Sequence, residues 1–283
     1  MKQRIITALI IAPLAIAAIF FLPFKFFVLF ASTLYLLASK EWGGFVAKVK
    51  TSLIIYLFAI ILAGTLLLIP LHALWLDGGI NPLIIYCLVI AASWWCLSLL
   101  MVISYPKSAK FWAKSKVIKS VMGLCTLIPF FWGTLLLRSI NIEQDFYFGA
   151  QLLMFVFALV WAADTGAYFC GKNFGKHKLA ANVSPGKTIE GFVGGLVSAM
   201  IVAYIGSVYF AITNDKLFIF FVASFVTTCV SALGDLNESI FKREAGLKDS
   251  GNLLPGHGGI LDRIDSLTAA VPVFSIFYLL WLH

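Results

Sequence analysis

Long apolar runs dominate this chain, and nine of them follow one another from end to end. Each is close to the roughly 20 residues that a helix needs to cross the ~30 Å hydrocarbon core of a bilayer. Polar and apolar residues do not alternate within them, as they would in the strands of a membrane β-barrel. We therefore predict an all-α, polytopic integral membrane protein whose spans cover about residues 5–22, 26–44, 52–70, 82–103, 117–137, 147–169, 191–212, 217–235 and 264–282.

The composition excludes the main alternatives to a membrane fold. Hydrophobic residues make up 61% of the 283 residues and charged residues only 12%, whereas a soluble domain is roughly half apolar and a quarter charged. This excess is more than one core of this size can bury. The chain is therefore neither a soluble globular protein nor a disordered one, and lipid is expected to be its main solvent.

The basic residues predict which loops face the cytoplasm. The chain carries 21 Lys and Arg against 13 Asp and Glu, a net charge of +8. In a membrane protein this indicates loops at an anionic cytoplasmic surface, not nucleic-acid binding. With a cytoplasmic N-terminus, all basic residues except Lys25, Arg138 and Lys216 lie on the inner side. We therefore expect the C-terminus outside, in a cell membrane of the bacterial inner-membrane type.

The polar residues that could form a functional site are concentrated in the second half of the chain. We divide the sequence into N-terminal transmembrane helices, 1–140, and a C-terminal transmembrane catalytic region, 141–283, with cytoplasmic loops at 170–190 and 236–263. Residues 1–24 could be a signal peptide, but the apolar run is long and no clean cleavage site follows, so we favour a retained span. The five cysteines form no CxxC pair and are expected to be buried as small hydrophobes.

Acidic residues mark both membrane ends of the segment 231–266. Asp235 and Ser239 are four residues apart and share one helix face, and Asp262 and Asp265 are three apart at the start of the last span. Carboxylates at membrane depth are costly and indicate a functional site by default. Their oxygens suit Mg²⁺, which is usually held by one or two carboxylates together with substrate phosphates. The alternative is a solvated loop between ordinary helix ends.

The same segment also offers groups that bind phosphate. Lys242, Arg243 and Lys248 supply cations, and the glycines around His257 expose backbone N–H groups. His257 taken alone is as compatible with a simple loop histidine as with a ligand. Together the residues indicate metal-assisted phosphoryl or nucleotidyl transfer at the membrane surface.

A gap-free run from Ser239 to Asp265 resembles the signature of the phosphatidate cytidylyltransferases, also called CDP-diacylglycerol synthases. The residues that carry the resemblance are Ser239-Ile240-Phe241-Lys242-Arg243, Lys248-Asp249 and Leu254-Pro255-Gly256-His257-Gly258-Gly259-Ile260-Leu261-Asp262-Arg263-Ile264-Asp265. The first 150 residues are similar to the family in hydropathy only.

A second stretch resembles another block of the same family. It consists of Asp164-Thr165-Gly166-Ala167-Tyr168 and, further on, Ser184-Pro185-Gly186-Lys187. In the family two lysines usually follow the serine–proline pair. Here Gly186 replaces the first, so any phosphate role rests more heavily on Lys187. The block lies just before a span whose N-terminal N–H groups can hold an anion; the alternative is a basic loop that serves topology only.

The resemblance implies a nucleotidyltransferase of phospholipid biosynthesis. It would transfer the cytidylyl group of CTP to phosphatidic acid, giving CDP-diacylglycerol and pyrophosphate, with Mg²⁺ as cofactor and a second metal ion left open. We expect Asp235, Asp262 and Asp265 to hold the metal, and the catalytic set to be Asp235, Asp262, Lys242, Arg243, Arg263 and Ser239. The expected substrate-binding set is Lys187, Ser184, Asp164, Lys248, Asp249, His257, Gly258 and Gly259.

Other functions are compatible with parts of this pattern. A CTP-dependent lipid-alcohol kinase must solve the same nucleotide-binding problem. A secondary transporter predicts acids near the middle of its spans, whereas Asp164, Asp235, Asp262 and Asp265 lie at one edge. The GxxxDxxxD pattern of the CDP-alcohol phosphotransferases does not occur here. Gly191, Gly194 and Gly195 permit close helix contact, and a homodimer is left open.

Overall fold

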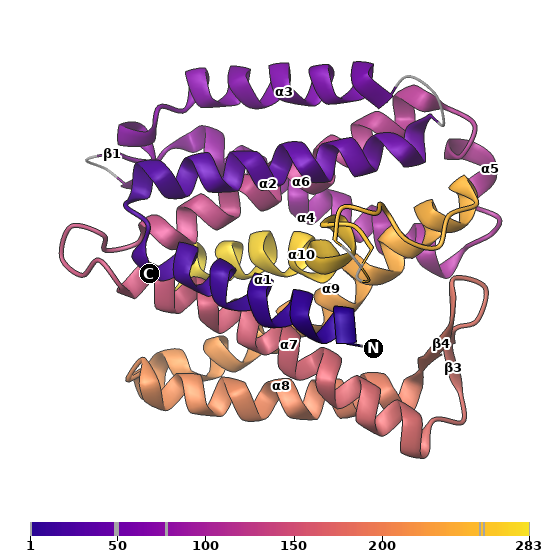
Figure 1. Ribbon diagram of the computed structural model, residues 1–283. Coiled ribbons are helices and arrows are strands. Elements are labelled where there is room, and N and C mark those ends of the chain that lie inside the picture. Colours follow the sequence, from indigo (N-terminus) through magenta and orange to yellow (C-terminus); the bar gives the residue numbers. More distant parts are fainter. Residues whose placement is uncertain (1, 48–50, 77–78, 255, 257, 283) are drawn as a thin grey trace.

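The computed structural model describes residues 2–47, 51–76, 79–254, 256 and 258–282. It is built mainly from helices (Figure 1). They are α1 (Lys2–Phe21), α2 (Phe24–Val46), α3 (Thr51–Leu68), η1 (Leu71–Ala73), α4 (Pro82–Ile103), α5 (Ala109–Trp112), α6 (Lys116–Ser139), α7 (Phe148–Phe174), α8 (Ile189–Tyr209), α9 (Asn214–Ala245), α10 (Leu261–Phe277) and η2 (Tyr278–Leu282).

Each of the nine apolar runs predicted from the sequence coincides with a helix. In the described parts of the chain, six helical segments are long and apolar enough to cross a membrane: α4, α6, α7, α8, α9 and Leu261–Leu280, which consists of α10 and the start of η2. Shorter apolar helical segments occur at Leu9–Phe21 and Leu53–Leu68. The all-α membrane architecture is thus confirmed, while the count of nine spans and the side of each terminus stay predictions.

Two short antiparallel strand pairs interrupt the helical pattern. Strand β1 (Trp75–Leu76) pairs with β2 (Gly79–Ile80), and β3 (Lys178–Ala180) pairs with β4 (Ser184–Thr188). In the second pair Lys178 lies opposite Thr188 and Ala180 lies opposite Ser184. This hairpin was not predicted. It turns the chain from the end of α7 to the start of α8 and carries Lys187 on its second strand.

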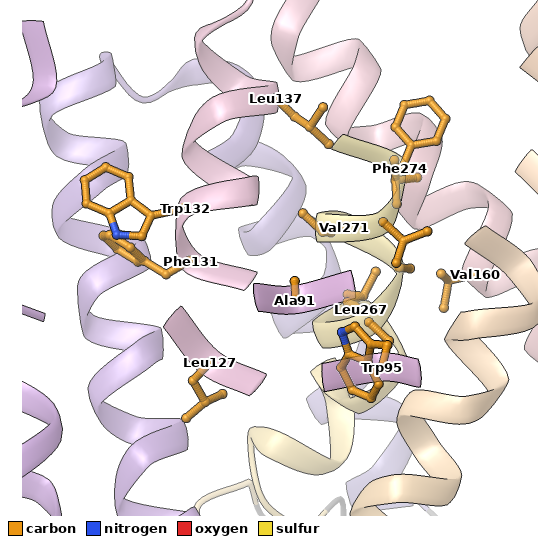
Figure 2. Close-up of a cluster of buried hydrophobic side chains, with 14 of the residues drawn as sticks. Ala91, Trp95, Leu127, Phe131, Trp132, Leu137, Val160, Leu267, Val271 and Phe274 are labelled. Carbon is orange, nitrogen blue, oxygen red and sulfur yellow. The ribbon is translucent and has the colours of Figure 1, made fainter. Parts of the chain in front are cut away.

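Helix α10 forms the centre of the bundle and packs against α4, α6, α7 and α9. Its apolar side chains meet those of α4, α6 and α7 in a continuous buried cluster (Figure 2). The labelled members of this cluster are Ala91, Trp95, Leu127, Phe131, Trp132, Leu137, Val160, Leu267, Val271 and Phe274. A helix surrounded by apolar neighbours has a fixed position, so the acidic residues at its first turn are fixed as well.

Glycines allow α7 and α8 to lie side by side in close contact (Figure 1). A Cβ atom at Gly195 would lie 2.6 Å from the Ala163 carbonyl oxygen, and one at Gly191 would lie 2.8 Å from that of Ala167. Small residues at such positions let helix backbones approach each other. Gly191, Gly194 and Gly195 therefore pack within the chain, against α7, and give no support to the homodimer that was left open.

The polar loops gather at one end of the bundle. Figure 1 shows α5, the β3–β4 hairpin and the segment 246–254 together at this end, where α1 also begins, whereas η2 lies at the opposite end. Helix α9 stops here at Gly246, whose left-handed conformation (φ 70°) lets its N–H bond the Arg243 carbonyl at 3.1 Å. The boundary at residues 140 and 141 falls between α6 and α7, and the proposed two-part division stays a prediction.

Candidate active site

Lys187 and Asp235 form an ion pair between the β3–β4 hairpin and helix α9. Lys187 Nζ lies 2.5 Å from Asp235 Oδ2, and about a quarter to a third of each side chain is exposed. One turn further along α9, Ser239 Oγ donates to Asp235 Oδ1 at 3.4 Å, as their four-residue spacing predicts. Asp164 of α7 interacts electrostatically with both members of the pair. Three elements thus place these four residues together.

A second lysine, Lys242, is held between two carboxylates. Its Nζ lies 2.7 Å from Glu238 Oε2 on α9 and 2.8 Å from Asp262 Oδ1 on α10. Exposure is low for all three side chains, at 12%, 3% and 8% for Lys242, Glu238 and Asp262. Charges this poorly solvated depend on their partners, so removing one of them leaves the others uncompensated.

The glycine-rich segment before α10 encloses the other oxygen of Asp262. Asp262 Oδ2 accepts from the backbone N–H groups of Ser250 and Gly259, both at 2.8 Å, and from Ser250 Oγ at 2.9 Å. Gly258 has φ 81°, and a Cβ there would lie 2.6 Å from Asp262 Oδ2. The sequence suggested that these N–H groups would face phosphate. In the structure the Gly259 N–H bonds the Asp262 carboxylate at the start of α10, where a negative charge is favoured, and phosphate binding by this segment stays a prediction.

Asp265 lies between the two lysine–carboxylate pairs. Its carboxylate interacts electrostatically with Asp235, Glu238 and Lys242, and its Oδ1 accepts from the Ser266 N–H at 2.7 Å. Helices α9 and α10 can approach this closely because residue 234 is glycine. A Cβ at Gly234 would lie 2.5 Å from the Asp265 carbonyl oxygen.

The remaining predicted residues lie around this centre. Arg243 Nε donates to the Val183 carbonyl at 3.2 Å and ties α9 to the hairpin. Lys248 is exposed, and Asp249 lies against Gly258. Ser184 is the first residue of β4, where it lies opposite Ala180. His257 is outside the described residues.

Sequence reasoning missed three polar residues at this end. Glu238 lies three residues after Asp235 and four before Lys242, a spacing that places it near both on a helix. Ser250 contacts Asp262, and Glu41 of α2 contacts Ser250 and the start of α10. Glu41 could have been found from the sequence, because an acidic residue inside an apolar run is a functional candidate by default.

The donor set fits a divalent cation that substrate helps to bind. Among the described residues, no group of three His, Cys, Asp or Glu side chains is arranged to hold a metal by itself. Mg²⁺, however, is usually held by one or two carboxylates plus phosphates and water. Glu238 Oε1 is buried close to Lys242 and Asp265, so a further carboxylate oxygen lies within this cluster.

An apolar cavity of about 460 Å³ opens beside the start of α10. Its lining comes from α1, α2, α6, α7 and α10 and is almost entirely hydrophobic. Leu254, Ile260 and Arg263, which lie close to Asp262 in the sequence, are also part of the lining. The cavity therefore reaches the first turn of α10, next to Asp262.

Comparisons with known proteins agree on one enzyme family. A family model described as "Cytidylyltransferase family" matches residues 2–281. A phosphatidate cytidylyltransferase of Haemophilus influenzae is 46% identical over 287 residues, covering 98% of this chain and 98% of the relative. One of Pseudomonas aeruginosa is 39% identical over 282 residues, covering 99% and 97%. One of Staphylococcus haemolyticus is 36% identical over 196 residues, covering 62% and 75%.

Proposed function

This chain belongs to the cytidylyltransferase family, and from that premise we propose that it transfers the cytidylyl group of CTP to phosphatidate, giving CDP-diacylglycerol and pyrophosphate. The observation that carries the proposal is the similarity, over nearly the whole chain, to enzymes named phosphatidate cytidylyltransferase that are 46% and 39% identical to it. The site is compatible with this reaction, since it joins two lysines, several carboxylates and an apolar cavity at one end of a membrane bundle.

The reaction needs no covalent enzyme intermediate. An oxygen of the lipid phosphate attacks the α-phosphorus of CTP, the bond from that phosphorus to the bridging oxygen breaks, and pyrophosphate leaves with the electron pair. The nucleophile and the leaving group are both phosphates, so the main demands are charge neutralisation and alignment. Lys187 and Lys242 are held close to the same carboxylate cluster, and we assign them to the phosphates of CTP.

We propose that Asp235 and Asp262 hold Mg²⁺, with Asp265 in support. When bound, Mg²⁺ would neutralise phosphate oxygens and make the α-phosphorus more susceptible to attack. The support is chemical: these oxygen ligands suit Mg²⁺, and Asp262 Oδ1 is the oxygen that the backbone leaves available. The other expected substrate contacts remain proposals: Arg243, Arg263, Lys248, Ser184, Asp249, His257, Gly258 and Gly259.

The lipid substrate would enter from the bilayer through the apolar cavity. A cavity of about 460 Å³ with a hydrophobic lining suits acyl-chain segments near the headgroup. Arg263 lies in its lining, next in sequence to Asp262. A phosphate beside this guanidinium would meet the carboxylate and lysine cluster while its acyl chains stay in apolar surroundings.

We further propose nine spans with the N-terminus in the cytoplasm and the C-terminus outside. The support is the distribution of basic residues and the gathering of the hairpin, α5 and segment 246–254 at the end where α1 begins (Figure 1). CTP is a cytoplasmic nucleotide, so this orientation would give it direct access to the site.

The proposed activity is tested with the purified protein. It is mixed with phosphatidate, CTP and Mg²⁺, and pyrophosphate and CDP-diacylglycerol are measured together. The expected result is one pyrophosphate for each CDP-diacylglycerol, with both products absent when phosphatidate is omitted. Pyrophosphate release that does not depend on phosphatidate would contradict the proposal.

A further inference from the structure

Glu41 is a buried acidic residue from the half of the chain to which sequence reasoning gave no site residue. It lies near the end of α2 and only 8% of its surface is exposed. Its Oε1 accepts from the Ile260 N–H at 2.9 Å, and its Oε2 accepts from the Leu261 N–H at 2.7 Å and from Ser250 Oγ at 3.0 Å. All these donors belong to the segment that surrounds Asp262.

These contacts make Glu41 the cap of α10, supplied by a distant helix. The first N–H groups of a helix have no partner within it, and those of Ile260 and Leu261 at the start of α10 are satisfied by Glu41. The positive end of the helix dipole favours a carboxylate at this place. Burial of the Glu41 charge is therefore compensated only while α2 and α10 keep this arrangement.

Ser250 connects Glu41 to Asp262. Ser250 Oγ lies 3.0 Å from Glu41 Oε2 and 2.9 Å from Asp262 Oδ2, so one hydroxyl group contacts both carboxylates. Glycine is required at two adjoining positions. A Cβ at Gly251 would lie 2.8 Å from Glu41 Oε1, and one at Gly259 would meet Glu41 Oε2 and Ser250 Oγ at 2.3 and 2.2 Å.

Helix α2 is itself anchored to the catalytic helices, so Glu41 cannot easily move away. The ring of Trp42, the next residue, packs against Phe241 of α9 with centroids 4.8 Å apart. Its Nε1 donates to the Lys119 carbonyl of α6 at 2.9 Å. A rigid support of this kind is what a precisely oriented side chain needs.

We infer that Glu41 is a positioning residue for the reaction: through Ser250 and the first N–H groups of α10, it fixes Asp262 so that Oδ1 faces Lys242. The inference rests on the proposed cytidylyltransferase activity. It gives the N-terminal half of the chain a defined part in the site, because α2 supplies the group that holds the Asp262 segment in place.

The test compares Glu41→Gln, Glu41→Ala, Ser250→Ala and the Glu41→Gln/Ser250→Ala double variant with the unaltered protein. Ser39→Ala is the matched control, since Ser39 is buried on the same helix but bonds the Tyr35 carbonyl. Activity is expressed per folded protein, with kcat and the KM for CTP determined separately. A loss of folded protein alone lowers the apparent kcat and leaves KM unchanged.

We expect Glu41→Ala to lower kcat/KM by about tenfold to a hundredfold, the effect of a small misplacement of a reacting group. The KM for CTP should rise as well, Glu41→Gln should be intermediate, and Ser39→Ala should keep both constants. In the Glu41→Gln background, the Ser250→Ala change should lower kcat/KM only a little further, because both residues act on Asp262 through one contact. Wild-type constants in Glu41→Ala, or losses that multiply in the double variant, would overturn the inference.

A second measurement separates this inference from the proposed function. The same four variants are compared with the unaltered protein by thermal unfolding in detergent without substrates. The coupling between Glu41 and Ser250 is the difference between the midpoint shift of the double variant and the sum of the shifts of Glu41→Gln and Ser250→Ala. Non-additive shifts are expected whichever reaction is catalysed. Additive shifts would refute the Glu41–Ser250 connection, whereas an inactive wild-type protein would refute the proposed function alone.

Discussion

The two oxygens of the Asp262 carboxylate have different surroundings. Oδ2 is held by two backbone N–H groups and a hydroxyl, whereas Oδ1 accepts from the Lys242 ammonium group. An aspartate bound in this way has a fixed direction and one oxygen available for a ligand. The sequence predicted Asp262 as a site residue, but it did not predict that the two carboxylate oxygens would have separate partners.

Residue types and spacing predicted part of the site at this scale. Asp235 and Ser239 share a helix face as expected, because a four-residue spacing determines that neighbourhood within a helix. The pairing of Lys187 with Asp235 could not be predicted, since the two residues are 48 positions apart and tertiary packing brings them together. The partners of Glu41 could not be predicted for the same reason, because they lie at the other end of the sequence.

Replacing Lys187 by Ala should lower turnover by about tenfold to a thousandfold, or roughly 1.4–4 kcal/mol. The change removes a cation assigned to the CTP phosphates and leaves Asp235 without its ion-pair partner. Lys178→Ala, an exposed lysine on the other strand of the hairpin, is the control and should retain activity. Steady-state rates at varied CTP give the result. Near-normal turnover of folded Lys187→Ala would show that this loop serves topology only.

Asp235→Asn and Asp262→Asn should each abolish turnover, and the double variant should be hardly worse than either. The expectation follows from the proposal that both carboxylates serve one ion, since residues that act as a unit give non-additive losses. Turnover is measured over a series of Mg²⁺ and Mn²⁺ concentrations, and excess metal should partly restore a variant that has only weakened binding. Losses that multiply, or an unchanged metal dependence, would contradict the shared-ion proposal.

At the scale of the elements, hydropathy predicted the helices well. A run of about 20 apolar residues in lipid must satisfy its own backbone hydrogen bonds, and a helix does so locally. The β3–β4 hairpin depends on a turn between two helices and has no such strong signal. The close packing of α9 on α10 could not be predicted from hydropathy either, because it depends on a single glycine, Gly234.

Gly234→Ala should therefore destabilise the protein by about 1–3 kcal/mol and reduce activity, because its Cβ would press on the backbone of α10 at Asp265. Gly64→Ala on α3 is the matched control, since nothing lies within 4 Å of the added Cβ. That control should be neutral or slightly stabilising, as alanine favours helix more than glycine does. Thermal unfolding in detergent and turnover are measured for both. Equal behaviour of the two variants would show that the α9–α10 spacing is not set at Gly234.

At the scale of the whole molecule, the orientation in the membrane decides whether CTP reaches the site. Single cysteines at Lys110, Asn252 and Asn214, all exposed positions, are introduced after replacement of the five native cysteines. A membrane-impermeant thiol reagent should label positions 110 and 252 only from the cytoplasmic side and position 214 only from outside. Labelling of position 252 from outside would contradict the proposed orientation.

The most direct test of the central claim follows the phosphorus atoms of CTP. The purified protein is given phosphatidate and Mg²⁺ with CTP labelled at either the α- or the γ-phosphate, and Asp262→Asn serves as the inactive control. A cytidylyltransferase must place the α-label in the lipid product and the γ-label in pyrophosphate. A γ-label in the lipid, with the α-label retained in CDP, would show a CTP-dependent kinase and contradict the account.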